Sequence, residues 1–575
     1  MKDLNNKKIF NMEYNTFNDS IVITKEFKKA KIVTKIKAFI FILLFLFYEG
    51  LTYVFKNNIK ILKVDLAPFV YLIICTFILS VALICSISLN KTFKNLISNV
   101  LIISFSGLIS YIQILHLVFF ETNLNNEINL FIGIILLFLI INSLNKILSI
   151  KKVLKNLKFI SSSNEKYSAK TFQKDMLSDD TLKNIDTLNP ICINRIKVKK
   201  LINFIKNSTQ KERSEKHTMI LAIFLISLAI IVSVLNFITN KNLPAALDEC
   251  IAITLFAYPV SLILSLKTSL YNTCKKALRK GALITNTYTI EKFKNINLSI
   301  IDASSLYPSK NVILKEIKTF KGQRVDEAIL YAATLASTKD GTLNKVFNRI
   351  ILGQKKLLEK ASNVIYEDKL GITGWINGKK IIIGNRDILK KNSIDPPSRD
   401  YENKYTKQNE GLIYIAVGNE LVAMFILEYK PNKKLKKTLA KAIKSGIEIL
   451  IRTSDTNITK ERIAIDFGLT KNLIKILPYD ENIYSKEIET FKETDESDLA
   501  VMPGQESLLN AAILCKKTAM NFKLIYAIQV TYLLMSLLIL TVLILCNSIY
   551  QIQEIQALIY ISFWSAFSLI CAKFK

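Results

Sequence analysis

The sequence predicts an α-helical polytopic membrane protein of about eight spans, with a large cytoplasmic α/β region between the sixth and seventh spans. Two observations support this fold class. The 575 residues are 50% hydrophobic, and the apolar residues gather in blocks of about 18 or more, the length that one helix needs to cross a bilayer core. The long polar segment 273–521 instead alternates strand-like and helix-like patterns.

Each apolar block is expected to be a spanning helix, because only a helix satisfies its own backbone hydrogen bonds in lipid. Lysine and arginine outnumber aspartate and glutamate by 78 to 47, and basic residues flank the spans on one side. Such an excess marks cytoplasmic loops, so both termini and both long polar segments are expected in the cytoplasm of a cell-membrane protein. The expected spans cover residues 38–55, 66–88, 97–120, 128–149, 218–238, 248–270, 523–546 and 554–572.

The net charge of +31 does not indicate a nucleic-acid partner, because the basic residues form no patch interleaved with aromatic residues. The lipid bilayer is the expected partner instead. The eight cysteines form no Cys-x-x-Cys pair, and His116 and His217 are the only histidines. Most cysteines lie in apolar runs, so we expect packing residues and no metal site. The Lys-, Ile- and Asn-rich composition with few Gly and Pro is typical of an AT-rich bacterial genome.

The polar segment after the sixth span has the pattern of an α/β fold. Leu298–Ile301 and Ile447–Ile451 are short apolar runs that predict strands, and Lys434–Ser445 predicts a helix that ends at Gly446. Strands that alternate with helices favour a parallel core. A β-rich stretch between them, with turn signals at Asn377-Gly378 and Gly418-Asn419, predicts a second module inserted into that core.

Several short motifs occur in an order that resembles the P-type ATPases, and most closely their heavy-metal-transporting, eight-span members. The motifs are Ala257-Tyr258-Pro259-Val260 within the sixth span, Ala277–Thr285, Asn297–Asp302, Gly371–Gly374, Ile383–Arg386 and Thr453-Ser454-Asp455. The resemblance implies a haloacid-dehalogenase-like core with an inserted α+β nucleotide-domain-like module. No single motif is specific, and the resemblance rests on their order, their spacing and the eight-span frame.

The resemblance also implies a division of the chain into seven parts. These are a basic cytoplasmic N-terminus 1–37, four spans in 38–149, a shortened actuator-like segment 150–217, two spans in 218–272, a phosphorylation-domain-like core 273–315 with 431–521, a nucleotide-domain-like insertion 316–430, and two spans with a short tail in 522–575.

The residues that match the family's functional positions follow from the same comparison. Asp302 stands at the phosphorylation position and Asp455 in the loop that resembles Thr-Gly-Asp. Gly371, Gly374, Gly384 and Asn385 match the nucleotide-binding elements. Pro259 and Glu49 are the candidates for a transport path: Pro259 is expected to kink its helix, and an intramembrane carboxylate is by default a functional candidate.

The sequence departs from the family at the groups that perform phosphoryl transfer. Ala303–Leu306 replaces Lys-Thr-Gly-Thr after the aspartate, and Ala500–Ser507 lacks both hinge aspartates that would hold Mg²⁺. The segment 150–217 has no Thr-Gly-Glu. Losing one electrostatic group costs about 3 kcal/mol, or roughly 10²–10³ in rate, so even two losses leave negligible turnover.

The sequence therefore predicts a pseudoenzyme that acts as a regulatory or scaffolding protein, with another membrane protein as its candidate partner. Two alternatives remain open. One is a divergent ATP-driven cation-transporting ATPase, and the other is a nucleotide sensor coupled to the membrane. ATP and Mg²⁺ are expected as cofactors only if residual activity or binding exists. The sequence favours a protein without enzymatic activity.

Overall fold

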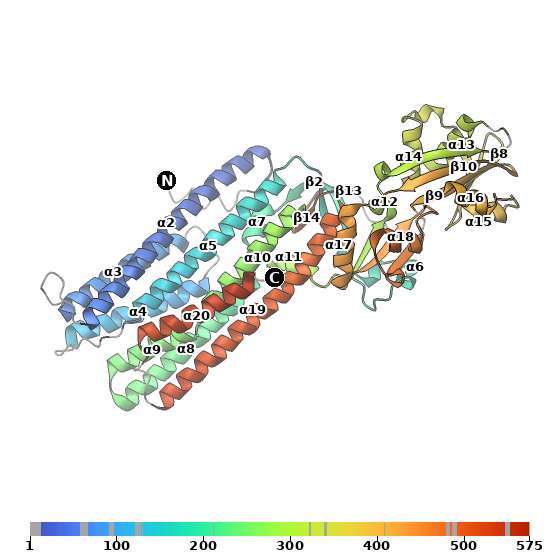
Figure 1. Ribbon diagram of the computed structural model, residues 1–575. Helices are drawn as coiled ribbons and strands as arrows, with labels where there is room; N and C mark the ends of the chain where they lie inside the picture. Colours follow the sequence, from blue (N-terminus) through green and yellow to red (C-terminus); the bar gives the residue numbers. More distant parts are fainter. Residues whose placement is uncertain are drawn as a thin grey trace.

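In the computed structural model the chain forms a long bundle of helices, an adjacent cytoplasmic sheet and a second sheet at the far end (Figure 1). The structure describes residues 13–57, 67–90, 97–120, 128, 130–210, 212–320, 322, 324–338, 342–407, 409–478, 483–485, 491–546 and 552–573.

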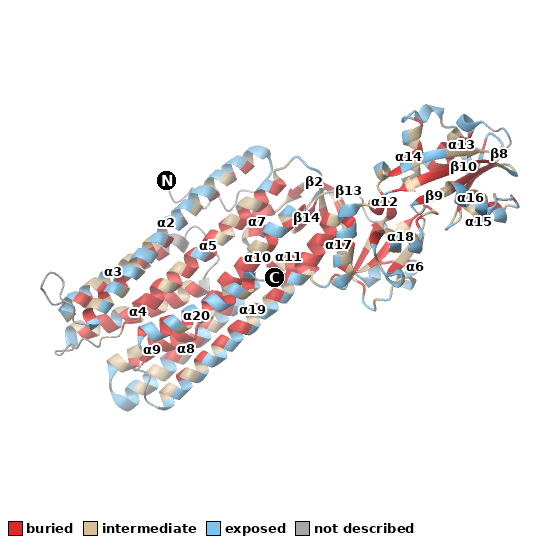
Figure 2. Cartoon of the chain, in the orientation of Figure 1, coloured by how far each residue is buried: buried red, intermediate tan, exposed pale blue. Residues whose placement is uncertain are grey.

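Within these residues, eight helical spans are long and apolar enough to cross a membrane, as the sequence predicted. They comprise α2 (Phe17–Lys56), α3 (Pro68–Asn90), α4 (Ile97–Phe120), α5 (Ile132–Ile160), α8 (Arg213–Asn240), α9 (Leu243–Ala257) with α10 (Ser261–Arg279), α19 (Gln505–Leu545) and α20 (Glu554–Lys573). The α9–α10 span is the central one, and its apolar window is 100% buried, whereas those of α8 and α19 are only 22% buried. Figure 2 shows the same contrast, with much of α8 and α19 exposed.

Four of the helices continue well beyond the predicted spans. The N-terminal part of α2 begins at Phe17, because Thr16 caps it in a reciprocal arrangement with Asp19, so much of the expected basic tail 1–37 is helix. Its residues Ile23 and Phe27 pack in a small cluster with the inner end of α5. The helices α5, α10 and α19 likewise extend beyond the predicted spans, and their ends pack against the cytoplasmic sheet.

The first cytoplasmic sheet has eight strands: β1 (Lys166–Phe172), β2 (Cys192–Ile202), β3 (Ala282–Ile284), β4 (Leu298–Asp302), β11 (Glu448–Thr453), β12 (Ile474–Pro478), β13 (Phe491–Glu496) and β14 (Leu499–Val501). Their order is β12-β11-β4-β2-β1-β14-β3, with β13 also paired to β2. The parallel strands β4, β11 and β12 form the core that the sequence predicted. Around them lie the helices α6 (Asp179–Lys183), α7 (Phe204–Thr209), α11 (Thr287–Phe293), α12 (Ala303–Leu306), α17 (Lys433–Lys444) and α18 (Lys460–Phe467).

The segment 150–217, expected as a shortened actuator-like piece, contributes two strands to this same sheet. Strand β2 pairs in parallel with β4 through Cys192 and Ile193, and its other edge pairs with β1. Strand β1 then pairs with β14 through Tyr167 and Ser168. Two strands of this segment therefore lie between β4, which ends in Asp302, and β14, which precedes the hinge-like segment.

The second sheet is antiparallel and contains β5 (Val312–Thr319), β6 (Ala361–Glu367), β7 (Gly371–Ile376), β8 (Lys379–Gly384), β9 (Glu410–Val417) and β10 (Glu420–Tyr429), in the order β5-β10-β9-β8-β7-β6. Helices α13 (Val325–Ser337) and α14 (Thr342–Ile350) cover one face. The other face carries α15 (Arg386–Lys391) and α16 (Arg399–Tyr405) (Figure 1). Alternate residues of β8, β9 and β10 enter the two cores, as a sheet covered on both faces requires.

Candidate functional site

Asp302 lies at the carboxyl end of β4 and is held by an arginine of the neighbouring strand. Arg452 is its partner in the parallel register of β4 and β11, and the Arg452 Nε donates to the Asp302 Oδ1 at 2.8 Å. The Asp302 side chain is 46% exposed and that of Arg452 is 24% exposed. The carboxylate at the family's phosphorylation position therefore already has a cationic partner from the protein.

A second arginine approaches the same place from the inserted strand β2. Arg195 donates to the backbone carbonyls of Met502 at 3.3 Å and of Pro503, and its guanidinium lies 4.9 Å from the centre of the Tyr167 ring. Burial lowers the pKa of Arg195, while the nearby Tyr167, Glu506 and Asp302 act in the opposite direction. The hinge-like segment 500–507 is thus bound to a cation, where the family has carboxylates for Mg²⁺.

Asp455 is buried, and its contacts run to its own loop and to the junction with the second sheet. The Tyr429 hydroxyl donates to its Oδ2 at 2.8 Å, and the Asn457 backbone N–H donates to its Oδ1 at 3.0 Å. The Tyr429 ring in turn packs edge-on against Tyr307 and under the Arg462 guanidinium. Burial raises the pKa of Asp455. This carboxyl group ties the two sheets together through Tyr429.

The glycines at the family's nucleotide-binding positions permit close backbone and helix packing. Gly371 and Gly384 are directly opposite each other in β7 and β8. A Cβ on Gly371, whose φ is +154°, would lie 2.6 Å from the Gly384 Cα and closer still to the Ile383 carbonyl oxygen. A Cβ on Gly374 would lie 2.7 Å from the Leu335 side chain of α13. The space beside all three glycines is filled by the protein itself.

Asn385 has a local structural role of the same kind. Its side chain caps α15 by accepting from the backbone N–H groups of Asp387 and Ile388 at 3.0 and 3.3 Å. Its Nδ2 donates to the Lys369 carbonyl at 2.8 Å. The side-chain oxygen and nitrogen of Asn385 are therefore both committed to the fold.

Pro259 interrupts the sixth span as predicted, because α9 ends at Ala257 and α10 begins at Ser261. The break is surrounded by neutral polar groups. Tyr532 donates to the Phe256 carbonyl at 2.5 Å, and the Gln529 amide donates to Ser261 at 3.1 Å. Hydroxyl and amide groups from α19 thus satisfy the backbone and side chains that the broken helix exposes.

Glu49 lies in the last turns of α2, and its neighbour is Glu554, a residue that the sequence reasoning did not select. A Cβ on Gly133 would lie 2.9 Å from the Glu554 Oε1 and closer still to the Glu49 Oε1. Glu554 accepts from the Gly133 backbone N–H at 2.5 Å and from the Tyr48 hydroxyl at 2.7 Å, so it caps the start of α5. Among the described residues, no group of three or more His, Cys, Asp or Glu could hold a metal ion.

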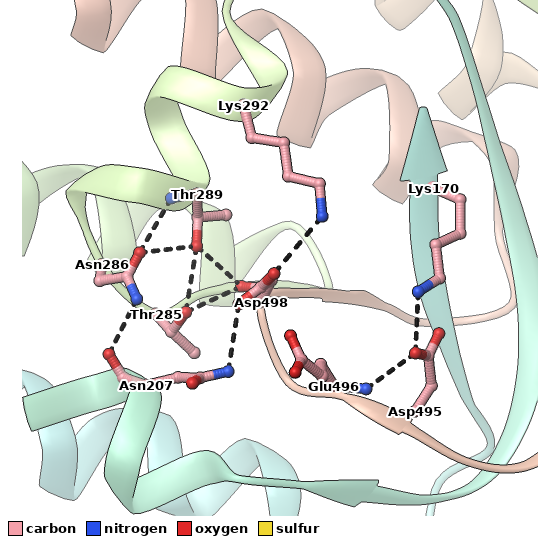
Figure 3. Close-up of polar contacts among 9 residues, drawn as sticks. All are labelled: Lys170, Asn207, Thr285, Asn286, Thr289, Lys292, Asp495, Glu496 and Asp498. Atoms are coloured by element: carbon pink, nitrogen blue, oxygen red, sulfur yellow. Dashed lines mark hydrogen bonds and ion pairs between the residues drawn. The ribbon is translucent and has the colours of Figure 1, made fainter. Parts of the chain in front are cut away.

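A polar network anchors the turn after β13 to the short helices α7 and α11 (Figure 3). Asn207 of α7 donates to the Asp498 Oδ1 at 3.1 Å, and Thr285 donates to the Asp498 carbonyl at 3.0 Å. Lys292 of α11 lies 3.5 Å from the Asp498 Oδ2. On the other side of the turn, Lys170 of β1 donates to Asp495 at 2.8 Å. The inserted strands and the hinge-like segment are therefore connected by side chains as well as by the sheet.

Among the described residues around Asp302, no cluster of carboxylates offers the oxygen ligands that Mg²⁺ prefers. Mg²⁺ prefers several oxygen ligands, whereas Asp302 is paired with Arg452, and Arg195 contacts the segment where the other carboxylates would be expected. Sequence reasoning missed both arginines. Arg452 had a detectable signal, since it lies between the predicted strand Ile447–Ile451 and the Thr453-Ser454-Asp455 loop. Arg195 had none, because its position depends on strand β2 entering the sheet.

Comparisons with known proteins agree with the motif order. No family model matches the sequence. The chain is 24% identical over 262 residues, or 44% of its length, to a copper-exporting P-type ATPase of Legionella pneumophila, and 25% identical over 267 residues to a copper-exporting P-type ATPase of Staphylococcus saprophyticus, covering 45% of this chain. These matches span 35% and 32% of the two relatives, so the chain spans about a third of the curated relatives that it matches.

Among solved structures, a zinc-transporting PIB-type ATPase in its E2.Pi state is 10% identical to this chain with a TM-score of 0.40, over 94% of this chain and 99% of that one. The sequence matches to the copper exporters and the order of the motifs together show that this chain is similar to the heavy-metal P-type ATPases.

Proposed function

We propose that this chain is a non-catalytic relative of the heavy-metal P-type ATPases that acts as a regulatory or scaffolding membrane protein. The observation that carries the proposal is the pairing of Asp302 with Arg452 at 2.8 Å. A carboxylate that acts as a nucleophile on ATP needs Mg²⁺ and free access to the phosphate. Here a fixed cation from the adjacent strand takes the place of the metal ion.

The two arginines also oppose the binding of a metal ion beside Asp302. Like unit charges about 4 Å apart repel each other by roughly 4 kcal/mol at an effective dielectric constant of about 20, and Mg²⁺ carries two charges. Arg195 adds to this effect because it contacts the carbonyls of Met502 and Pro503. Arg452 pairs with Asp302 in the absence of any ligand, so the pair has a structural use that does not depend on phosphoryl transfer.

The integration of β1 and β2 into the sheet supports the same proposal. The seven register pairs between β1 and β2 join a hairpin whose outer edges pair with β4 and β14. A segment bonded on both edges cannot approach Asp302 as a separate domain without breaking the sheet. A rigid cytoplasmic frame is suited to holding a partner, and another membrane protein is the partner class that we propose.

The test is a phosphoenzyme assay on the purified full-length protein with radiolabelled ATP and Mg²⁺. We expect no acid-stable phosphoprotein above the background of Asp302→Asn. The variant Arg452→Gln frees the carboxylate and should still not be phosphorylated, because the Mg²⁺ ligands remain missing. Phosphorylation of the native protein that Asp302→Asn abolishes would refute the proposal. Titration with a fluorescent ATP analogue would separately reveal a nucleotide sensor that binds without hydrolysis.

A second candidate, ATP-driven cation transport, is favoured by the sequence matches to copper exporters and by the break at Pro259 in the most buried span. The groups near this break are hydroxyls and amides, which are poor ligands for soft metal ions. Vanadate-sensitive, cation-stimulated ATPase activity in proteoliposomes would establish this candidate. We expect no such activity with monovalent copper or zinc.

A further inference from the structure

A groove of about 690 Å³ opens at the cytoplasmic end of the helix bundle, between the start of α8, helix α11 and the middle of α19. Two bases and a histidine come from α8, and two tyrosines and a glutamate come from the other two helices. The lining residues are Arg213, Lys216, His217, Tyr288, Glu291 and Tyr526. None of these residues belongs to the site around Asp302.

The groove continues onto surface that faces lipid. Lys216 shares a helix face with Ile220, Ile223 and Phe224, which are 68%, 51% and 53% exposed. On α19, Tyr526 precedes Val530 by one helical turn, and Val530 is 53% exposed. Both helices are the least buried of the bundle, so acyl chains are their natural neighbours (Figure 2). A molecule in the groove can therefore have a polar head between α8 and α11 and an apolar tail along α8 and α19.

The charges in the groove favour an anionic head. Arg213 is paired with Glu291 at 2.9 Å, and its guanidinium lies 5.7 Å from the centre of the Tyr288 ring. Glu291 is the only carboxylate among the lining residues, and it is paired with Arg213. The positive charge of Lys216 therefore has no carboxylate of its own in the lining. The His217 ring contacts Tyr526 edge-on, with ring centres 6.5 Å apart. Arginine, lysine and tyrosine at a cytoplasmic membrane surface are the groups that hold a lipid phosphate.

We propose that this groove binds the headgroup of an anionic phospholipid from the cytoplasmic leaflet, with its phosphate between Lys216 and Arg213 and its acyl chains along the exposed faces of α8 and α19. The inference is independent of the catalytic status of Asp302, because the groove shares no residue with that site.

The test is lipid titration of the full-length protein in detergent, followed by native mass spectrometry. The native protein should retain phosphatidylglycerol and bind phosphatidylcholine at least tenfold more weakly. The double variant Arg213→Gln/Lys216→Gln should bind phosphatidylglycerol about thirtyfold more weakly, since a basic residue at the membrane surface contributes about 1 kcal/mol. The charge-preserving variant Arg213→Lys/Lys216→Arg should retain most of the affinity.

The matched control is Lys28→Gln/Lys35→Gln, which removes two charges from the exposed cytoplasmic part of α2 and should leave the affinity unchanged. Inorganic phosphate in place of lipid should not compete below millimolar concentration, because it lacks the contacts along α8 and α19. Three results would each overturn the proposal: equal binding of both lipids, an equal loss of affinity in Arg213→Gln/Lys216→Gln and in the control Lys28→Gln/Lys35→Gln, or competition by micromolar phosphate. Thermal unfolding without added lipid verifies that every variant is folded.

Discussion

Substituting alanine for Gly371 or Gly384 distinguishes a packing role of these glycines from a role in binding nucleotide. The added Cβ at Gly371 would lie 2.6 Å from the Gly384 Cα, and the one at Gly384 would lie 2.9 Å from the Gly371 Cα and from the Ile388 side chain. Each would come closer still to a backbone carbonyl oxygen, of Ile383 and Leu370 respectively. Strands β7 and β8 must separate locally to admit either methyl group.

The expected cost of each substitution is about 3 kcal/mol of local stability. Overpacking a core typically costs about 1–3 kcal/mol, and Gly371 adds backbone strain of about 1–3 kcal/mol because its φ is +154°. Gly378→Ala is the matched control in the turn between the same strands. Its φ is +75° and no atom lies within 4 Å of the added Cβ, so only about 1–2 kcal/mol of strain is expected.

The assay is hydrogen–deuterium exchange of the full-length protein, read on peptides from β6 to β8. In Gly371→Ala and Gly384→Ala the β7 and β8 amides should exchange about a hundredfold faster than in the native protein, and Gly378→Ala should show a much smaller change. Native-like protection in both variants, together with loss of binding of a fluorescent ATP analogue, would refute the packing explanation. It would show that the two glycines admit a nucleotide.

Three further predictions concern other parts of the structure. Asp302→Asn should lower the free energy of unfolding by no more than about 1 kcal/mol in chemical denaturation, because the Arg452 pair is partly exposed; a loss above 3 kcal/mol would contradict this. Burial raises the pKa of Asp455 in the folded protein, so its contribution to stability falls as the pH rises above about 4. The melting temperature of Asp455→Asn, measured relative to that of the native protein, should therefore increase from pH 4.5 to 8. A difference in melting temperature that does not change with pH would contradict this. Tyr532→Phe should lower the free energy of unfolding by about 0.6 kcal/mol, because it removes the hydrogen bond to the Phe256 carbonyl and such bonds between membrane helices contribute about this much. An unchanged thermal midpoint in detergent would contradict this.

The membrane helices and some of the strands could be predicted from the sequence because their signals are local. The runs Leu298–Ile301 and Ile447–Ile451 became β4 and β11 with boundaries within two residues. Helix ends were predicted less well. The predicted first span began at residue 38, whereas α2 begins at Phe17, because the lysine-rich stretch before that span is helical and capped at Thr16 but is too polar to be recognised as part of a span.

The surroundings of Asp302 could be predicted only in part because they depend on long-range pairing. The strand positions of Asp302 and Arg452 followed from two apolar runs, but their register and the ion pair did not. Strand β2 contacts β4 through only two residue pairs, Cys192 with Leu298 and Ile193 with Ser299. Nothing in those residues distinguishes an internal strand of this sheet from a strand of a separate domain, so the position of Arg195 could not be predicted.

The inserted hairpin links the two halves of the membrane bundle through one sheet. Helix α5 leads directly into β1, and β2 leads through α7 into α8, so the sheet lies between the fourth and fifth spans. Asn207 of α7 and Lys292 of α11 both contact Asp498, which immediately precedes β14, the strand before α19. Alternating access requires groups of helices to move relative to each other, and here such motion would have to break a continuous sheet and a buried polar network together. Under the proposed scaffolding role, these connections would hold the two halves of the bundle in a fixed arrangement.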